Sequence, residues 1–362
     1  MNRIIILVLV LIITGSNLFA EKKLPVIRAN SKMVDVRAGN SFHKGDWKIS
    51  PEAKPDIYTT SLIGEKITFY TDLDSISVKI NSKTKFDFII LLNDTIEALT
   101  EITYKPGYLD ILKTASEYNH NDARPVPKFI YQSQDDPNLV KLRAAFKLDS
   151  IAGGGNEVSR ILNLLLWVHN LIPHDGNHDN PAVKNSLSMV KICKNGNRGL
   201  NCRGLATILN ECYLSMGIPS RIVTCMPKDS IFNDCHVINM VYSFEHKKWL
   251  WIDPTNFAYV MNEKGELLSI EEVRERIIRD LPLILNPDAN WNHKATETKE
   301  EYLYNYMAKN LFRLESPLES EFDYETWKSG KEYTYVELIS LNAFNQLPQK
   351  SVKKDTATGG NS

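Results

Sequence analysis

Cysteine is absent from most of this chain, and the few cysteines present lie in one segment. All five of them, in 362 residues, fall between Cys193 and Cys235. No Cys-x-x-Cys pair and no tight spacing of cysteine with histidine occurs, so the sequence predicts no structural zinc site. We expect no cofactor. The odd count leaves at least one thiol free if the others form disulfides, and the sequence does not assign disulfide partners.

An excess of charge of either sign is also missing. Lys and Arg number 43 and Asp and Glu number 44, which gives a net charge of -1. This balance offers no general electrostatic case for binding nucleic acid or a membrane surface. Glycine and proline, at 17 and 16 residues, are too scarce for collagen-like or proline-rich classes. An apolar fraction of 43% is instead typical of folded globular domains.

Long apolar runs are absent after the first twenty residues. Residues 4–13 are all Ile, Leu or Val, and they follow a lone charge at Arg3 and precede a small residue at Ala20. This order is typical of a secretory signal peptide. A run of about ten apolar residues reaches only about half of a 30 Å bilayer core, which argues against an uncleaved anchor. We therefore expect residues 1–20 to be removed and the mature protein to be extracytoplasmic: periplasmic, at the cell surface or secreted.

Period-two patterning predicts a β-rich first domain. Residues 75–80 alternate polar and apolar side chains, and 66–71 and 86–92 are short strand-like runs near turn residues. Such alternation predicts strands with one buried face. Several short strands are typical of a small antiparallel sandwich, which we place at 30–118. The proline-marked stretch 119–150 is then a linker or a segment that wraps around the next domain.

Helical periodicity followed by strands predicts an α+β second domain over 151–345. The polar residues 346–362 are expected to form a flexible tail. Helices are expected at 156–172, 203–216, 270–279 and 299–312, and strands at 220–225, 235–242, 248–252 and 333–339.

Three residues of this second domain form a candidate catalytic set. Cys202 lies where a loop becomes a helix, and the N–H groups of a helix N-terminus stabilise a thiolate. His236 opens a strand and Asp253 closes the next one, so an antiparallel hairpin would place the two side by side. A lone cysteine at a helix start is usually a buried small side chain. The ordered histidine and carboxylate instead favour a nucleophile, its base and a group that orients the base.

The order of these residues resembles the transglutaminase-like superfamily, which uses a papain-like Cys–His–Asp arrangement. The resemblance covers about 155–260 and departs at Asn201, where the family usually has a small or acidic residue. It implies a papain-like α+β fold with, in this chain, a helical C-terminal extension. The matching pattern is Cys202 at a helix start, then Gly217-Ile218-Pro219-Ser220-Arg221-Ile222-Val223, the isolated His236, and Trp251-Ile252-Asp253.

The resemblance implies a cysteine peptidase or amidase that acts through a thioester acyl-enzyme. Secreted bacterial members of the superfamily are similar to hydrolases more often than to cross-linking enzymes. The chain also lacks a calcium loop of the D-x-[DN]-x-[DN]-G type. The expected substrate is a peptide, a protein or a cell-wall-type amide. Water as acyl acceptor gives hydrolysis and an amine gives transfer, and the sequence does not decide between the two.

An alternative hypothesis is that the protein is a binding module and not an enzyme, with an inactive transglutaminase-like scaffold. The β-rich domain would then bind a glycan or a peptide at the cell surface. In a third reading this domain packs against the second one and shapes its cleft. The sequence leaves these alternatives open.

A group of histidines and aspartates precedes the candidate nucleophile. Its members are separated by a proline and by a Gly-Asn turn, so they do not share a helix face and do not predict a metal site. We expect a loop beside the active site, in which His174 and Asn201 contact the oxyanion or the substrate. Cys212 and Cys235 are expected to pack rather than react, and Arg221 is expected to be buried and structural. The group consists of His169, His174, Asp175, His178 and Asp179.

Overall fold

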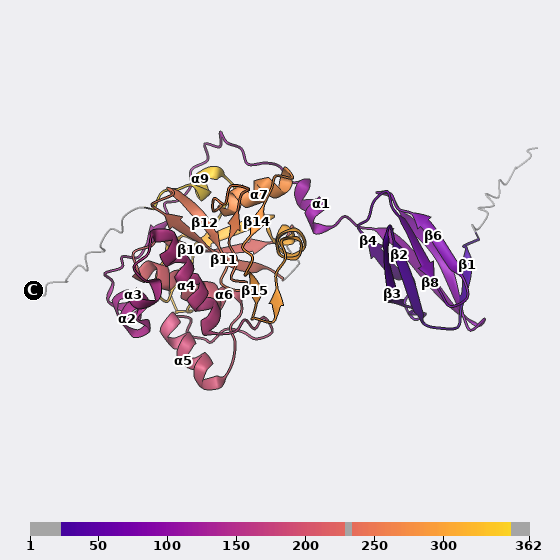
Figure 1. Cartoon of the computed structure of the whole chain (residues 1–362), viewed down its shortest axis with the longest axis horizontal. Helices are drawn as coiled ribbons and strands as arrows, with labels where there is room; N and C mark the ends of the chain where they lie inside the picture. Colours follow the sequence, from indigo (N-terminus) through magenta and orange to yellow (C-terminus); the bar gives the residue numbers. More distant parts are fainter. Residues whose placement is uncertain (1–22, 229–233, 349–362) are drawn as a thin grey trace, which may run out of the picture. The chain divides into compact units, whose positions relative to one another are not determined.

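The computed structural model describes residues 23–228 and 234–348, and the chain divides into two compact units after Pro106 (Figure 1). The predicted signal peptide lies outside the described residues, as does nearly all of the predicted tail. No helix in the described part of the chain is long and apolar enough to cross a bilayer. The predicted α+β class, with a β-rich first domain, is confirmed.

The first unit consists of two four-stranded sheets around one apolar core, which includes Val36, Phe69 and Phe88. One sheet is antiparallel, in the order β3-β2-β5-β6. The other, in the order β1-β7-β8-β4, is antiparallel at its centre and parallel at both edges. Alternation within a strand does not encode the direction of its neighbour, so the parallel edges were not predicted. The strands are β1 (Val26–Ala29), β2 (Met33–Ala38), β3 (Ser41–Lys48), β4 (Asp56–Thr60), β5 (Lys66–Tyr70), β6 (Ser75–Lys79), β7 (Lys85–Leu92) and β8 (Ile96–Tyr104).

The second unit is built on a five-stranded antiparallel sheet in the order β12-β11-β10-β17-β19. Three short pairs lie outside it, and these are β9–β18, β13–β14 and β15–β16. The sheet strands are β10 (Ser220–Met226), β11 (His236–Ser243), β12 (Lys248–Ile252), β17 (Arg313–Pro317) and β19 (Tyr335–Glu337). The short strands are β9 (Ile130–Tyr131), β13 (Val260–Met261), β14 (Ile284–Leu285), β15 (Asn290–Trp291), β16 (Ala295–Thr296) and β18 (Glu319–Ser320).

Helices cover both faces of this sheet, so its central strands are buried on both sides. Met240 of β11 packs in one apolar core and its neighbour Val241 in another. The core around Val241 includes α4 and α6, which lie beside the sheet in Figure 1. The core around Met240 includes α7 and η1. The helices are α1 (Tyr108–Lys113), α2 (Pro137–Phe146), α3 (Leu148–Ala152), α4 (Glu157–Leu171), α5 (Ser186–Gly196), α6 (Cys202–Ser215), α7 (Ile270–Ile278), the π-helix η1 (Glu300–Met307), α8 (Ala308–Asn310) and α9 (Leu341–Phe344).

The segment 119–150 is part of the second unit and packs within it. Tyr131 is buried and stacks on Trp249 at 5.9 Å between ring centroids. The Phe129 N–H donates to the Gln346 side chain over 2.8 Å. These contacts join the start of the unit to its C-terminal segment.

Arg221 is buried, as predicted, and is held between aromatic rings. Its guanidinium lies 4.0 Å from the ring centroid of Phe129 and 4.6 Å from that of Trp249. It also donates to the carbonyl oxygens of Ala343 and Phe344, over 3.0 and 3.1 Å. Arg221 therefore ties β10 to α9 and has no part in the cleft described below.

Candidate active site

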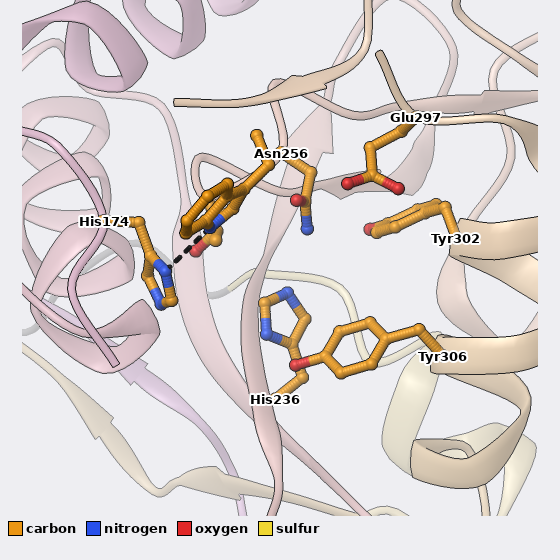
Figure 2. A pocket seen from close by; sticks show the side chains of 8 residues that line it. His174, His236, Asn256, Glu297, Tyr302 and Tyr306 are labelled. Atoms are coloured by element: carbon orange, nitrogen blue, oxygen red, sulfur yellow. Dashed lines mark hydrogen bonds between the residues drawn. The ribbon is translucent and has the colours of Figure 1, made fainter. Parts of the chain in front are cut away.

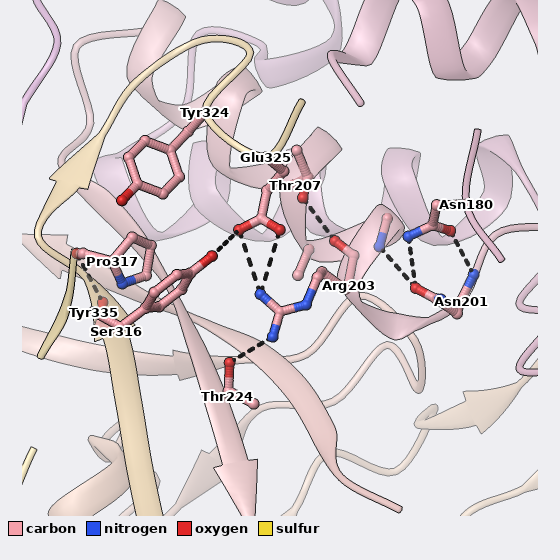
Figure 3. Close-up of polar contacts among 12 residues, drawn as sticks. Asn180, Asn201, Arg203, Thr207, Thr224, Ser316, Pro317, Tyr324, Glu325 and Tyr335 are labelled. Atoms are coloured by element: carbon pink, nitrogen blue, oxygen red, sulfur yellow. Dashed lines mark hydrogen bonds and ion pairs between the residues drawn. The ribbon is translucent and has the colours of Figure 1, made fainter. Parts of the chain in front are cut away.

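The helix α6 begins at Cys202 because Asn201 caps it. The Asn201 side-chain oxygen accepts the Gly204 N–H over 3.2 Å. Asn180 donates to the same oxygen over 2.7 Å, and its own side-chain oxygen accepts the Asn201 N–H over 3.1 Å (Figure 3). Gly204 allows this close approach, since a Cβ there would lie 2.7 Å from the Asn180 oxygen. The Asn201 side chain thus fixes the start of the helix that carries the thiol.

An ion pair beside the thiol anchors the same helix end to the sheet. Arg203 pairs with Glu325 at 3.3 Å and donates to the Thr224 hydroxyl over 2.8 Å (Figure 3). The Tyr335 hydroxyl donates to Glu325 over 3.3 Å. The position of Cys202 is therefore set by a helix, a strand and the C-terminal segment together.

His236 and Asp253 lie side by side at the ends of adjacent strands, and both are buried. The His236 Nε2 lies 2.8 Å from the Asp253 Oδ2. Three further donors converge on this carboxylate. They are the Tyr302 hydroxyl at 2.7 Å, the Asn256 side-chain amide at 3.1 Å and the Thr255 N–H at 2.8 Å. Because Asp253 holds Nε2, the Nδ1 of His236 is the nitrogen left for the Cys202 thiol, with which the ring forms a hydrogen bond.

The electrostatics of the three groups favour a thiolate–imidazolium pair. Burial raises the pKa of Cys202, but hydrogen bonds from His174 and His236 outweigh it and lower that pKa to about 6. Burial disfavours the His236 imidazolium, yet Tyr306 and Asp253 hold the pKa of His236 well above its ordinary value. Burial also opposes the Asp253 carboxylate, and His236 keeps its pKa below the usual range. All three shifts favour the charged form of the group concerned: the thiolate, the imidazolium and the carboxylate.

The other four cysteines do not share this environment. All five are free, and none forms a disulfide within the described residues. Burial raises the pKa of Cys193, Cys212, Cys225 and Cys235. Cys202 alone among the five has a lowered pKa.

His174 reaches the thiol from a loop that the β15–β16 hairpin holds. The His174 N–H donates to the Asn292 side-chain oxygen over 2.7 Å, and its carbonyl accepts the Asn292 side-chain amide over 2.8 Å. The Trp291 indole N–H donates to the His174 Nδ1 over 3.0 Å (Figure 2). An indole nitrogen only donates, so a neutral His174 carries its proton on Nε2. The Nε2–H is then the donor available toward Cys202.

A cleft of about 310 Å³ lies beside His174 and His236. His174 and His236 stand on one side, and Tyr302 and Tyr306 of η1 face them (Figure 2). The sequence predicted an ordinary helix here, whereas the observed turns are those of a π-helix, a form frequent at functional sites. The remaining lining residues are Thr255, Asn256, Trp291 and Glu297.

The predicted group of histidines and aspartates is dispersed. The buried His169 ring bonds the Pro254 carbonyl at 3.0 Å and the Asn290 side chain at 3.1 Å, a structural role. His178 pairs with Asp175 at the surface, at 2.7 Å. Over the described ranges, no three His, Cys, Asp or Glu side chains gather as a metal site would require. Only His174 of this group lines the cleft.

One family model agrees with the resemblance in the sequence. Residues 145–254 match the family model of the transglutaminase-like superfamily core. A candidate cysteine protease of known structure from Cytophaga hutchinsonii is similar over 39% of this chain and 43% of its own, with 20% identity and a TM-score of 0.26. Red sea bream transglutaminase is similar over 65% of this chain and 50% of its own, with 10% identity and a TM-score of 0.23. This chain thus spans half or less of either protein, and no curated protein matches it.

Proposed function

We propose, from the transglutaminase-like core at residues 145–254, that this protein is a cysteine peptidase or amidase. Cys202 is the nucleophile, His236 its acid and base, and Asp253 the group that orients the imidazole. The observation that carries the proposal is the contact of one thiol, its pKa lowered to about 6, with a buried imidazole that a carboxylate holds at 2.8 Å. The predicted signal peptide supports action outside the cytoplasm.

The reaction follows from the positions of the three groups. The Cys202 thiolate attacks the carbonyl carbon of an amide, and the π electrons move to the oxygen. As the C–N bond breaks, the His236 imidazolium donates its Nδ1 proton to the leaving nitrogen. The thioester that remains is attacked by water, which His236 deprotonates, and this releases the acid and restores the thiolate. Asp253 accepts the Nε2–H throughout and keeps the ring aligned.

Two donors are available for the oxyanion of the tetrahedral intermediate. The Cys202 backbone N–H lies in the first turn of α6, where N–H groups have no partner within the helix. The second donor is the Nε2–H of His174, whose loop brings it to the Cys202 sulfur. Donors placed before the charge develops stabilise the transition state without reorganisation.

Replacing Trp291 tests the role of His174. Trp291→Phe keeps an aromatic ring but removes the N–H that fixes the His174 tautomer, so we expect kcat to fall about tenfold with KM nearly unchanged. His174→Gln supplies an amide N–H whatever residue 291 is. In the His174→Gln background, Trp291→Phe is therefore expected to lower kcat by less than about twofold, which a double-mutant cycle measures. Equal losses in both backgrounds would exclude a role through the imidazole.

The nature of the acyl acceptor is tested with a glutamine peptide and a labelled primary amine. Conversion of the glutamine amide to the acid, detected by mass spectrometry, is the expected product and indicates hydrolysis. A covalent amine adduct would indicate transfer. If the glutamine peptide stays unchanged and no peptide of a library is cleaved, the inactive scaffold is favoured.

A further inference from the structure

Glu297 is the carboxylate of the cleft that has no hydrogen-bond or ion-pair partner among the residues that the structure describes. Glu297 follows the β15–β16 hairpin, and its N–H donates to the Ala289 carbonyl over 2.9 Å, which fixes the backbone. Its partly buried side chain lines the cleft together with His174 and His236 (Figure 2). Within residues 23–228 and 234–348, no group donates a hydrogen bond to this carboxylate or pairs with it.

The neighbouring glutamates are occupied, in contrast to Glu297. The Glu301 carboxylate accepts the Thr298 hydroxyl over 2.9 Å, at the start of the π-helix. Glu300 pairs with Lys299 at 3.5 Å. Both side chains are exposed and neither lines the cleft. Glu297 therefore differs from Glu300 and Glu301, whose carboxylates have partners among the described residues.

The surroundings of Glu297 favour a cation. Burial, then Glu301, then Asp253, raise the pKa of the Glu297 carboxyl, because each opposes a further negative charge there. The Nζ of Lys294, on the hairpin, lies 5.7 Å from the Trp291 ring centroid. Trp291 and the two tyrosines of η1 also line the cleft, and the faces of aromatic rings attract cations. A positive group in the cleft would thus meet an unpaired carboxylate and aromatic walls.

We propose that Glu297 binds an ammonium group of the substrate, which makes the preferred substrates amides that carry a primary amine close to the scissile bond. The inference rests on the proposed function, since the cleft is lined by His174 and His236, the two histidines that hydrogen-bond to the Cys202 thiol. Two sources of the ammonium fit this chemistry, a lysine-type side chain and a free amino terminus. Neutral and anionic substrates leave the Glu297 charge unbalanced, so they bind less well.

The charge preference is measurable without knowing the substrate. The full chain is treated with 2-aminoethyl, 2-hydroxyethyl or 2-sulfonatoethyl methanethiosulfonate, and modification of Cys202 is followed by peptide mass spectrometry. These reagents are cationic, neutral and anionic, respectively. Glu297→Gln is expected to lower the ratio of cationic to anionic rates about tenfold and to leave the neutral rate within about twofold. The matched control Glu301→Gln removes a nearby charge outside the cleft, and the ratio is expected to change less than about twofold.

The outcomes separate this inference from the proposed function. A neutral reagent that labels Cys202 no faster than an ordinary thiol overturns the proposed function and the substrate assignment with it. Fast neutral labelling with an unchanged ratio in Glu297→Gln overturns only the ammonium site. An equal fall of the ratio in Glu301→Gln does the same, because it assigns the effect to the general field of the protein.

Matched peptides then distinguish the two sources of the ammonium. One pair differs by lysine against norleucine, and the other by a free against an acetylated amino terminus. The pair that contains the true source is expected to differ about tenfold in kcat/KM, and Glu297→Gln is expected to remove the difference. If neither pair differs, the assignment of cationic substrates is wrong.

Discussion

Cys202→Ser is expected to lower kcat for amide hydrolysis by at least about a thousandfold. The reason is the ionisation of the thiol, whose pKa is lowered to about 6, whereas a serine hydroxyl stays protonated in the same contacts. The sulfur packs against Ala206, Ile222 and Val237, and oxygen is smaller than sulfur, so the fold should tolerate the change. Hydrolysis is measured with a peptide substrate identified from a library, and folding by thermal denaturation.

The adjacent cysteine provides the control for this result. Cys235 precedes His236 directly, but burial raises the pKa of its thiol. Cys235→Ser is therefore expected to keep kcat within about threefold of the unaltered protein. If Cys202→Ser turns over amides at the unaltered rate, Cys202 is not the nucleophile and the mechanism fails.

Asp253→Asn is expected to lower kcat by about a thousandfold or more. The carboxylate accepts from four donors, among them the His236 Nε2–H and the Tyr302 hydroxyl. An amide has one oxygen and an NH₂ group, so at least one donor would meet another donor. The neutral ring would then favour the tautomer with its proton on Nδ1, and it could not accept the proton of the Cys202 thiol. The kinetics are measured beside the pH dependence of thiol alkylation, which should move to higher pH.

Tyr302→Phe is the matched control for the carboxylate. It removes one of the four donors to Asp253 and leaves the pair with His236 in place. We expect a loss in kcat of less than about tenfold. If Asp253→Asn loses no more than Tyr302→Phe, orientation of the imidazole is not the function of the carboxylate.

The parts of this site that the sequence predicted depend on local signals. Helical spacing of apolar residues after Cys202 predicts a helix that starts there, and two strand-like segments joined by a short turn predict a hairpin. The hairpin alone suffices to place His236 beside Asp253. The approach of the Cys202 thiol to this pair was expected from the order of the three residues and the resemblance to the superfamily, not from a local signal. The structure has α6 at Cys202–Ser215 and pairs β11 with β12 accordingly.

The opposite wall of the cleft carries no comparable signal. Trp291, Glu297 and Tyr302 come from a hairpin and a π-helix that follow the hairpin of His236 and Asp253 in the chain. Nothing in their spacing relates them to Cys202, because tertiary packing alone brings them there. Glu325, which pairs with Arg203 across 122 residues, was missed for the same reason. Local patterns therefore predicted the reacting groups, but not the residues proposed to orient them or to select the substrate.

The most direct test of the account is the alkylation rate of Cys202 against pH in the unaltered protein and in His236→Ala. A thiolate reacts and a thiol does not, so the rate follows the ionised fraction, which is present above the pKa and lost as the pH falls through it. We expect an inflection at about pH 6 that shifts upward by more than about one pH unit in His236→Ala. An inflection in the unaltered protein near the ordinary thiol pKa of about 8.5, and unchanged in the variant, would contradict an activated nucleophile at Cys202.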